Sequence, residues 1–315
     1  MRTRDPEELL ERARTGDRGA LARLLSLVEA GGPPSRELGR LAFPLGGQAY
    51  TVGITGAPGA GKSTLTSALI GTIRRTGDQV AVLAIDPSSP YTGGAILGDR
   101  VRMQDHANDA GVFIRSMATR GHLGGLALAA PQAIRVLDAA GLPWVLVETV
   151  GVGQVEVEIA GAADTTVVVV NPGWGDGVQA NKAGLLEIAD VFVINKADRP
   201  GTEETRRDLQ LMLDLSDLRD WRPPIIATVA SRGEGVDELW QAVVDHRAHL
   251  DKTGLLQERR ARRTSEELRE IIVRRLEQRA NELCAGEDWK QLEASVQERR
   301  TDPYTAAEAL LDPLL

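Results

Sequence analysis

The sequence is poor in cysteine and aromatic residues and has no long apolar run. Its single cysteine, Cys284, excludes an internal disulfide framework and suits a reducing compartment. No apolar stretch approaches the length of about 20 residues that a membrane-crossing helix needs. The first residues include acidic side chains where a signal peptide would place its apolar region. We therefore expect a cytoplasmic protein that does not enter a membrane.

A basic excess is also missing. The chain has 37 Lys and Arg residues against 45 Asp and Glu residues, a formal net charge of -8 at pH 7 and a pI of about 5.2. A nucleic-acid partner is not expected, because no positive surplus exists to neutralise a phosphate backbone. What is present is ordinary for a globular protein, with 42% hydrophobic and 26% charged residues in a chain long enough to bury a substantial core.

The first 30 residues are predicted to form two helices. Asp5 precedes a proline and two acidic residues, which is typical of a helix start, and Asp17 can cap a second helix that carries several leucines. Residues 31–35 contain two glycines and two prolines, so they are predicted to form a linker.

Short apolar runs alternate with helical patterns through the middle of the chain. Several runs are apolar at consecutive positions, as at residues 167–170, which indicates strands covered on both faces. The pattern predicts an α/β fold in which helices flank a mostly parallel sheet. The runs are 49–55, 79–85, 112–115, 144–149, 165–170, 191–195 and 225–229.

After about residue 250 the composition shifts to charged helix. Thr264 and Glu267 have the spacing of a capping box, so we expect a helix to begin there, and Glu270 and Arg274 are spaced as an ion pair on its polar face. Its apolar stripe must pack on the main domain or on a second copy of the chain. The predicted divisions are an N-terminal helical extension (1–45), a P-loop domain (46–250) and a C-terminal helical dimerisation arm (251–315).

Residues 56–63 match the phosphate-binding pattern G-x-x-x-x-G-K-[ST] at every fixed position. A predicted strand precedes them and a helical pattern follows, which is the context of a P-loop. The glycines let backbone N–H groups converge on phosphate oxygens, and the helix directs its positive end at the same anion. A glycine-rich turn that binds nothing is the less favoured alternative. The predicted nucleotide-binding residues here are Gly56, Ala57, Pro58, Gly59, Ala60, Gly61, Lys62, Ser63 and Thr64.

Lys62 and Ser63 are assigned the chemistry of this loop. Lys62 can reach the β- and γ-phosphates, and the Ser63 hydroxyl can ligate Mg²⁺. We expect Lys62 to have no structural partner until phosphate arrives, so Lys62→Ala should abolish turnover with little effect on the stability of the free protein.

Guanine selectivity is predicted from the pattern N-K-x-D at residues 195–198, which directly follows an apolar run. The Asp198 carboxylate can accept hydrogen bonds from both N1–H and the exocyclic amine of guanine, a donor pair that adenine lacks. Residues Val229, Ala230 and Ser231, after the next run, are predicted to contact the base through their backbone. GTP and GDP are therefore favoured over ATP, with Asn195, Lys196 and Asp198 as binding residues.

An acidic switch is predicted at residues 148–151, where Glu148 and Gly151 resemble the D-x-x-G pattern of small GTPases with Glu in place of Asp. The carboxylate can organise Mg²⁺, and the Gly151 N–H can contact the γ-phosphate. Val152 stands where Ras-like proteins carry the glutamine that orients the attacking water. We therefore expect slow turnover that rises when a partner completes the site.

Two further acidic residues, Asp86 and Asp99, are candidates for a Mg²⁺-facing switch that orders with the γ-phosphate. An aspartate after a strand is also a common turn residue, and that alternative stays open. With these residues the candidate catalytic set is Lys62, Glu148 and Asp99, and the candidate metal set is Ser63, Asp86, Asp99 and Glu148.

These motifs together resemble one family, the MeaB-type GTPases, over nearly the whole chain. Members are chaperones of cobalamin-dependent acyl-CoA mutases, chiefly methylmalonyl-CoA mutase, and have also been labelled arginine/ornithine transport kinases (ArgK). Beside the P-loop and residues 195–198, the resemblance rests on the stretches A-I-D-P-S-S-P (84–90), G-G-A-I-L-G-D-R (93–100), S-M-A-T-R-G (116–121) and E-T-V-G-V-G-Q (148–154).

The resemblance implies a homodimer joined through C-terminal helices and Mg²⁺ bound or ordered by the candidate metal set. It also implies a mobile loop that senses the nucleotide and the mutase, whose ends here are Asp176 and Lys182. Trp174, just before this loop, is either an exposed partner contact or, the favoured interpretation, a buried aromatic packed on the sheet.

Three other functions compete with this one. A small-molecule kinase would share the P-loop, but residues 195–198 argue against it. A GTPase that delivers nickel or zinc would need a Cys or His cluster, and among the four histidines only His246 and His249 have a chelating spacing, with a solvated pair favoured. A pure scaffold is disfavoured by the intact Lys62 and Ser63.

Overall fold

The structure of the chain is a computed structural model that describes residues 5–87, 104–106, 108–119, 125–149, 161–173, 187–215 and 220–311. The chain divides into two compact units, Met1–Arg260 and Ala261–Leu315. No helix within the described ranges is both long and apolar enough to cross a bilayer.

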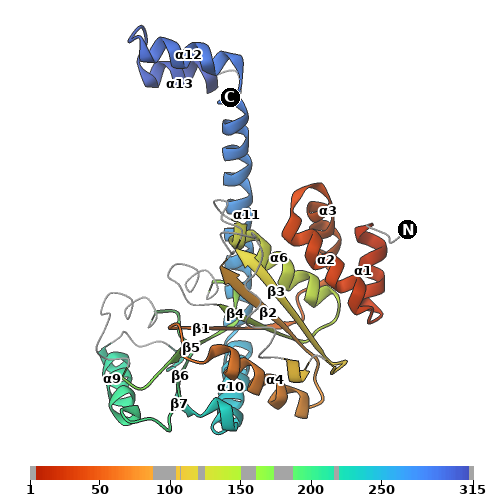
Figure 1. Cartoon of the computed structure of the whole chain (residues 1–315), viewed down its shortest axis with the longest axis vertical. Coiled ribbons are helices and arrows are strands. Elements are labelled where there is room, and N and C mark those ends of the chain that lie inside the picture. The colour runs from red at the N-terminus through yellow and green to blue at the C-terminus, as the bar shows by residue number, and fades with distance from the viewer. Residues whose placement is uncertain are drawn as a thin grey trace. The chain divides into compact units, whose positions relative to one another are not determined.

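The first unit is built on a parallel sheet, which among the described residues has seven strands in the order β3-β2-β4-β1-β5-β6-β7 (Figure 1). Each predicted apolar run lies in one of these strands, so the predicted α/β fold is confirmed. The strands are β1 (Tyr50–Gly56), β2 (Val80–Pro87), β3 (Val112–Thr119), β4 (Trp144–Thr149), β5 (Thr165–Val170), β6 (Val191–Asn195) and β7 (Ile225–Thr228).

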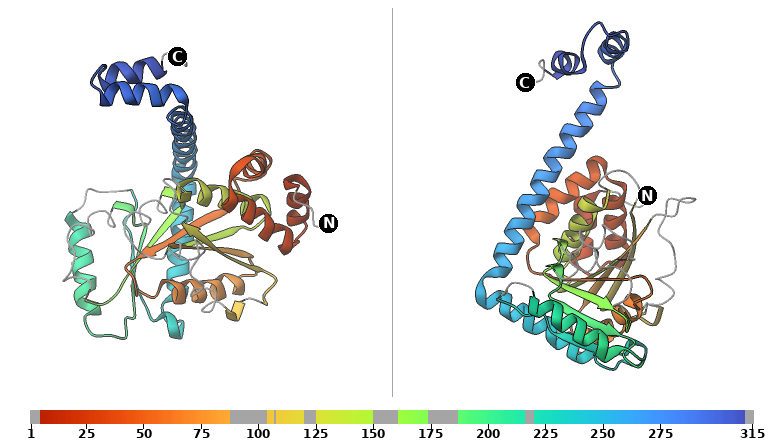
Figure 2. Two further views of the ribbon diagram at one scale, coloured as in Figure 1. Left: turned by 45° about the horizontal axis from the view of Figure 1, so that its top comes forward. Right: turned by 90° about the vertical axis from the view of Figure 1, so that its left-hand side faces the viewer.

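Helices cover both faces of the sheet, which explains the strands with consecutive apolar residues (Figures 1 and 2). On β5, Val167 and Val169 pack in one core with α4 (Lys62–Arg75) and α10 (Val236–Thr253). Val168 and Val170 face the other way, toward α9 (Thr202–Leu215). On that second face, β2 and β4 pack with α1 (Pro6–Arg14), α2 (Arg18–Ala30), α3 (Gly32–Ala42) and α6 (Gly125–Ala139).

The N-terminal helices begin as predicted but continue further. The Asp5 carboxylate accepts a hydrogen bond from the Glu7 N–H, and the Asp17 carboxylate accepts one from the Ala20 N–H, so both predicted caps are confirmed. The predicted linker at residues 31–35 is wrong, because α3 starts at Gly32. Its two prolines lie in the first turn, where the backbone N–H groups have no helical partner to lose.

A cluster of charged side chains lies at the amino ends of the strands, at the edge of the sheet opposite the P-loop. Asp164 and Asp190 precede β5 and β6, and each accepts a hydrogen bond from a backbone N–H of a neighbouring strand, at 3.0 and 2.8 Å. Arg260 approaches the Asp164 carboxylate at 2.7 Å, and Arg259 approaches that of Asp190 at 3.2 Å. Both arginines lie in the first turns of α11 (Leu255–Leu283), so the start of this helix is anchored to the sheet.

His246 of α10 lies inside this cluster with 0% of its surface exposed. Its Nδ1 is hydrogen-bonded to the Thr165 hydroxyl at 2.8 Å, and its Nε2 is 3.3 Å from an Asp190 carboxylate oxygen. The expected solvated pair with His249 is therefore wrong for His246. Burial lowers the pKa of His246 to about 4, although the Asp190 carboxylate opposes the shift.

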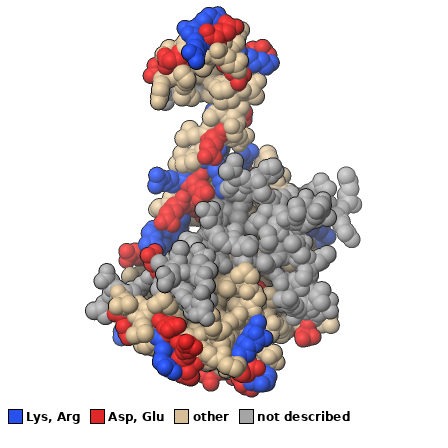
Figure 3. Space-filling view, turned by 60° about the vertical axis from the view of Figure 1, so that its left-hand side comes forward, with Lys and Arg blue, Asp and Glu red and all other residues tan. Residues whose placement is uncertain are grey.

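The second unit contains the rest of α11, α12 (Glu287–Gln297) and α13 (Pro303–Leu311). The predicted capping box is wrong, since Gly254, with φ 76°, ends α10 and α11 starts at the next residue, which leaves Thr264 inside a helix. The predicted ion pair between Glu270 and Arg274 is confirmed at 3.4 Å, and charges of both signs follow this helix (Figure 3).

This second unit has almost no core of its own. Among its described residues only Ala306 is buried. Large apolar side chains on α11 are exposed, including Leu268 at 59% and Leu276 at 65%. Helices whose apolar stripe remains uncovered gain little stability from burial. The unit therefore needs a further surface to cover it.

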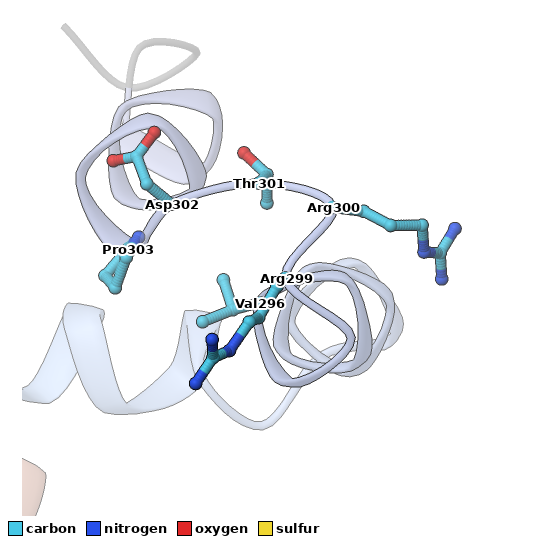
Figure 4. Close-up of a pocket in the computed structure, with 6 residues that line it drawn as sticks. All are labelled: Val296, Arg299, Arg300, Thr301, Asp302 and Pro303. Carbon is cyan, nitrogen blue, oxygen red and sulfur yellow. The ribbon is translucent and has the colours of Figure 1, made fainter.

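A pocket of about 590 Å³ lies at the turn between α12 and α13. Arg299 and Arg300 line it but point in opposite directions (Figure 4), and Arg300 pairs with Glu298 at 2.5 Å. Because the cationic groups do not converge on one point, the pocket lacks the geometry of an anion site.

The buried His246 predicts a specific pH dependence of stability. The unfolded imidazole takes up a proton near pH 6.5, whereas the folded one does so only near pH 4, so acidification favours unfolding between these values. Between pH 7 and pH 4 the free energy of unfolding should fall by about 3 kcal/mol more in the wild type than in His246→Asn. Chemical denaturation at several pH values measures this. Above pH 7 the difference between the two proteins should be constant, and parallel curves down to pH 4 would contradict the account.

Candidate functional site

The predicted site residues gather at the carboxyl ends of neighbouring strands. In the register of the sheet Ile54 of β1 lies opposite Glu148 of β4, and Gly56 lies opposite Val169 of β5. The strand β6, which ends at Asn195, pairs with β5 on its other side. Because all these strands are parallel, their ends meet at one edge, where ligands bind in open α/β sheets.

The P-loop depends on glycine at two points of close approach. A Cβ atom on Gly56, which has φ 133°, would lie 2.0 Å from the carbonyl oxygen of Val169. A Cβ atom on Gly61, which has φ 90°, would lie 2.4 Å from the side-chain amide nitrogen of Asn195. Neither position can hold a larger residue without moving the strand ends that surround the loop.

Lys62 is the first residue of α4, and its ammonium group lies inside the loop. Nζ donates hydrogen bonds to the carbonyl oxygens of Gly56 at 2.6 Å and Ala57 at 3.1 Å, and the residue is 6% exposed. The expectation that Lys62 has no structural partner before phosphate arrives is therefore wrong. A buried ammonium must be hydrogen-bonded, and the loop carbonyls supply the acceptors.

Ser63 and Glu148 are brought together as candidate metal ligands. The Ser63 hydroxyl donates a hydrogen bond to a Glu148 carboxylate oxygen at 2.5 Å, and both residues are buried. A hydroxyl and a carboxylate are hard oxygen donors, so this pair fits Mg²⁺. Asp86 lies at the end of β2, two residues beyond the partner of Glu148 in the register, which puts it at the same edge. Its side chain lies outside the described residues.

Asn195 joins the P-loop to the turn that follows β7. Its amide nitrogen donates to the Ala60 carbonyl at 2.8 Å, and its amide oxygen accepts from the Thr228 hydroxyl at 3.1 Å and from the Ala230 N–H at 3.2 Å. Because a trans peptide directs its C=O and N–H to opposite sides, holding the Ala60 carbonyl turns the Gly61 N–H away from Asn195. Asn195 therefore orients the peptide between Ala60 and Gly61 through its hydrogen bonds within the protein.

The Gly59 carbonyl receives two more side-chain donors. Lys196, whose backbone is left-handed at φ 61°, donates from Nζ at 2.6 Å. Asn171, directly after β5, donates from its side-chain amide at 3.4 Å. Sequence reasoning did not select Asn171, although a polar residue directly after an apolar strand is a usable signal for this edge of the sheet.

Asp198 lies with its side chain 42% exposed, near a cation that sequence reasoning also missed. Arg232 Nη1 is 3.9 Å from the Asp198 carboxylate, and Arg232 is held by Glu234 at 2.7 Å. The predicted base contacts Val229, Ala230 and Ser231 lie next to it, in the turn that follows β7. There the Ala230 N–H is already bonded to Asn195 and the Val229 N–H to the Glu234 carbonyl.

Several predicted residues lie outside the described part of the chain. They are Asp99, Gly151, Val152, Trp174, Asp176 and Lys182. Among the described residues no three His, Cys, Asp or Glu side chains form a group that could hold a metal.

Comparison with known proteins gives consistent matches over most of the chain. The family model for "Methylmalonyl Co-A mutase-associated GTPase MeaB" matches residues 21–285. A protein of Pyrococcus abyssi with a provisional GTPase name is 50% identical over 313 residues, which cover 98% of this chain and 97% of that protein. The GTPase ArgK of Escherichia coli is 39% identical over 293 residues, 90% and 87% of the two chains. The crystal structure of an LAO/AO transport system kinase superposes with a TM-score of 0.74 at 30% identity, covering 100% of this chain and 99% of that one.

Proposed function

The chain belongs to the MeaB family of GTPases, and from that premise we propose that it is a Mg²⁺-dependent GTP hydrolase that serves as a chaperone of a cobalamin-dependent acyl-CoA mutase, such as methylmalonyl-CoA mutase. The observation that carries the nucleotide part is the hydrogen bonding of Asn195, which connects the P-loop to the guanine motif. The family description, which names a mutase-associated GTPase, supports the choice of partner. The chaperone would gate, protect or help to load the cobalamin.

Guanine recognition is proposed for Asp198. Its exposed carboxylate can accept the N1–H and the exocyclic amine of guanine, while Asn195 and Lys196 hold the loop beside it. Backbone groups of Val229, Ala230 and Ser231 are the proposed further contacts to the base, and of their N–H groups those of Val229 and Ala230 are already bonded within the protein. An adenine base would leave the carboxylate without its donor pair, so GTP and GDP are the proposed ligands.

The phosphates are proposed to bind over the P-loop, residues 56–64. The Lys62 ammonium, already oriented by the Gly56 and Ala57 carbonyls, can neutralise β- and γ-phosphate oxygens with little reorganisation. Bound Mg²⁺ supplies charge neutralisation between these oxygens. Ser63 and Glu148 are positioned to hold the ion, with Asp86 and Asp99 as the proposed remaining ligands and the Gly151 N–H as a γ-phosphate contact.

Two other functions are retained as alternatives. The similar crystal structure is that of a transport system kinase, so a P-loop kinase linked to arginine or ornithine transport is the second candidate. A metal-delivery GTPase is the third, and it would require a Cys or His cluster. A kinase must transfer the γ-phosphate to an added amino acid, whereas the proposed GTPase transfers it to water.

A homodimer is proposed from the apolar stripe of the second unit. The division into an N-terminal extension (1–45), a GTPase domain (46–250) and an arm (251–315) assigns this stripe to the arm. Leu268 and Leu276 are exposed in a unit that has almost no core, so a second copy of the arm would cover them. Self-association through one patch on both subunits is the commonest arrangement of a dimer.

The proposed dimer can be tested by placing charged residues in the apolar stripe of α11. Leu268→Asp with Leu276→Asp should give a monomer that still binds GDP, because the nucleotide site lies in the other unit. Asn281→Asp, at an exposed polar position on the other side of the same helix, adds charge of the same sign and should leave the dimer intact. Light scattering at micromolar concentration reports the mass. A monomeric wild type would contradict the proposal.

The partner-activated GTPase is tested by hydrolysis with and without a cobalamin-dependent mutase. Val152 cannot orient water, so the free protein should turn over on a scale of minutes or slower. A completed site can gain about three to five orders of magnitude in phosphoryl transfer. Lys62→Ala should be inactive in both conditions, which controls for contaminating hydrolases.

The proposed sensing loop is tested by Asp176→Ala and Lys182→Ala, each of which should reduce the fold acceleration by the mutase, measured against that variant's own basal turnover. Fast turnover by the free protein would show that its site is complete. Acceleration that survives both substitutions would place the coupling on another surface. Phosphate transfer to arginine or ornithine instead of water would favour the kinase.

A further inference from the structure

Asn171 stands at a fixed point beside the P-loop. It follows the last residue of β5, and β5 pairs with β1 in a register that puts Gly56 opposite Val169. Two residues later the Gly173 N–H donates a hydrogen bond to the hydroxyl of Thr205, a buried residue of α9, at 3.1 Å. The backbone at Asn171 is therefore held between the sheet and α9, and the side chain starts from a defined position.

The Asn171 side chain forms a hydrogen bond with the P-loop. Its amide nitrogen donates to the Gly59 carbonyl, while its amide oxygen is buried and has no hydrogen-bond partner among the described residues. Asn171 is partly exposed, but a buried acceptor atom without a hydrogen bond is costly, so its presence at this point needs a reason other than strand formation. The reason that the geometry offers is the orientation of Gly59.

Gly59 is an exposed residue of the loop. Its φ is 75°, and a Cβ atom placed there would meet no atom of the described residues within 4 Å, apart from those of its chain neighbours. Since nothing described packs against the side-chain position of Gly59, hydrogen bonds are the contacts that orient this peptide. Its carbonyl oxygen accepts from Asn171 and from Lys196 Nζ, and the N–H on the other side of the same peptide, that of Ala60, donates to the Ala57 carbonyl at 3.1 Å.

We propose that Asn171 is a positioning residue of the nucleotide site, which retains the bound nucleotide by holding the Gly59 carbonyl and thereby the shape of the phosphate-binding loop. This inference rests on the proposed binding of GDP and GTP. It differs from the guanine motif in one respect: Asn171 comes from β5 rather than from the strand that carries Asp198. Its effect should therefore follow the phosphates and not the base.

The test compares Asn171→Leu with Asn171→Ala. Leucine keeps the branched skeleton of asparagine, with a larger volume, but has neither donor nor acceptor, whereas alanine loses both the polar groups and the volume. If donation to Gly59 is what matters, both variants should release a fluorescent GDP analogue about fivefold faster than the wild type, as expected for one lost hydrogen bond. If Asn171 merely fills space, leucine should release GDP at the wild-type rate, and the proposal fails.

Two further measurements separate positioning from folding and from the proposed function. The affinities of both variants for GDP and for inorganic tripolyphosphate should fall by the same factor, while the melting temperature of the nucleotide-free leucine variant stays near that of the wild type. A loss confined to GDP, or a weakening that tracks a large fall in melting temperature, would overturn the inference. A wild type that binds no GDP would instead refute the proposed function, which makes the two failures distinguishable.

Discussion

The buried amide of Asn195 is the contact on which the rest of the site depends. With one donor and one acceptor it joins Ala60 in the phosphate loop to Thr228 and Ala230 at the end of β7. An amide is suited to this role because it can satisfy a carbonyl on one side and donors on the other without carrying charge into a buried place. The P-loop and the turn after β7 are consequently linked through one residue, and a displacement of one would shift the other.

The parallel sheet makes this arrangement possible and also separates it from the second polar cluster. At the carboxyl edge, strand ends contribute Glu148, Asn171 and Asn195 around the loop, where polar groups can act on a ligand. At the opposite edge, Asp164 and Asp190 bind strand N–H groups and the arginines that begin α11. Buried ion pairs of this kind add little net stability by themselves, but removing one partner is costly. We interpret the second cluster as the element that fixes where the C-terminal helix starts.

The strands and the strand–loop–helix around residues 56–63 could be predicted from the sequence because each follows from local rules. The guanine-binding role of residues 195–198 stays a prediction. Consecutive valines such as those of β5 indicate a strand that is covered on both faces. The pattern of glycines followed by Lys62 and Ser63 is typical of a P-loop and is seldom found elsewhere. The errors have equally physical causes. Prolines at residues 33 and 34 suggested a break, yet proline is tolerated in a first helical turn. The burial of His246 depends on how α10 packs against the sheet, and no local pattern reports it. The carbonyl partners of Lys62 are local, five and six residues earlier in the same loop, and they follow from the conformation of that loop, which the spacing of its residues does not give.

The most direct test of the account is a calorimetric titration of the nucleotide-free protein with GDP and with ADP, repeated on Asp198→Asn with xanthosine diphosphate. If the strand that braces the phosphate loop also selects the base, the wild type should bind GDP at least about 100-fold more tightly than ADP. Asp198→Asn should lose this preference and gain affinity for the xanthine nucleotide, whose extra carbonyl can accept from the new amide. Equal affinities of the wild type for GDP and ADP would contradict the account.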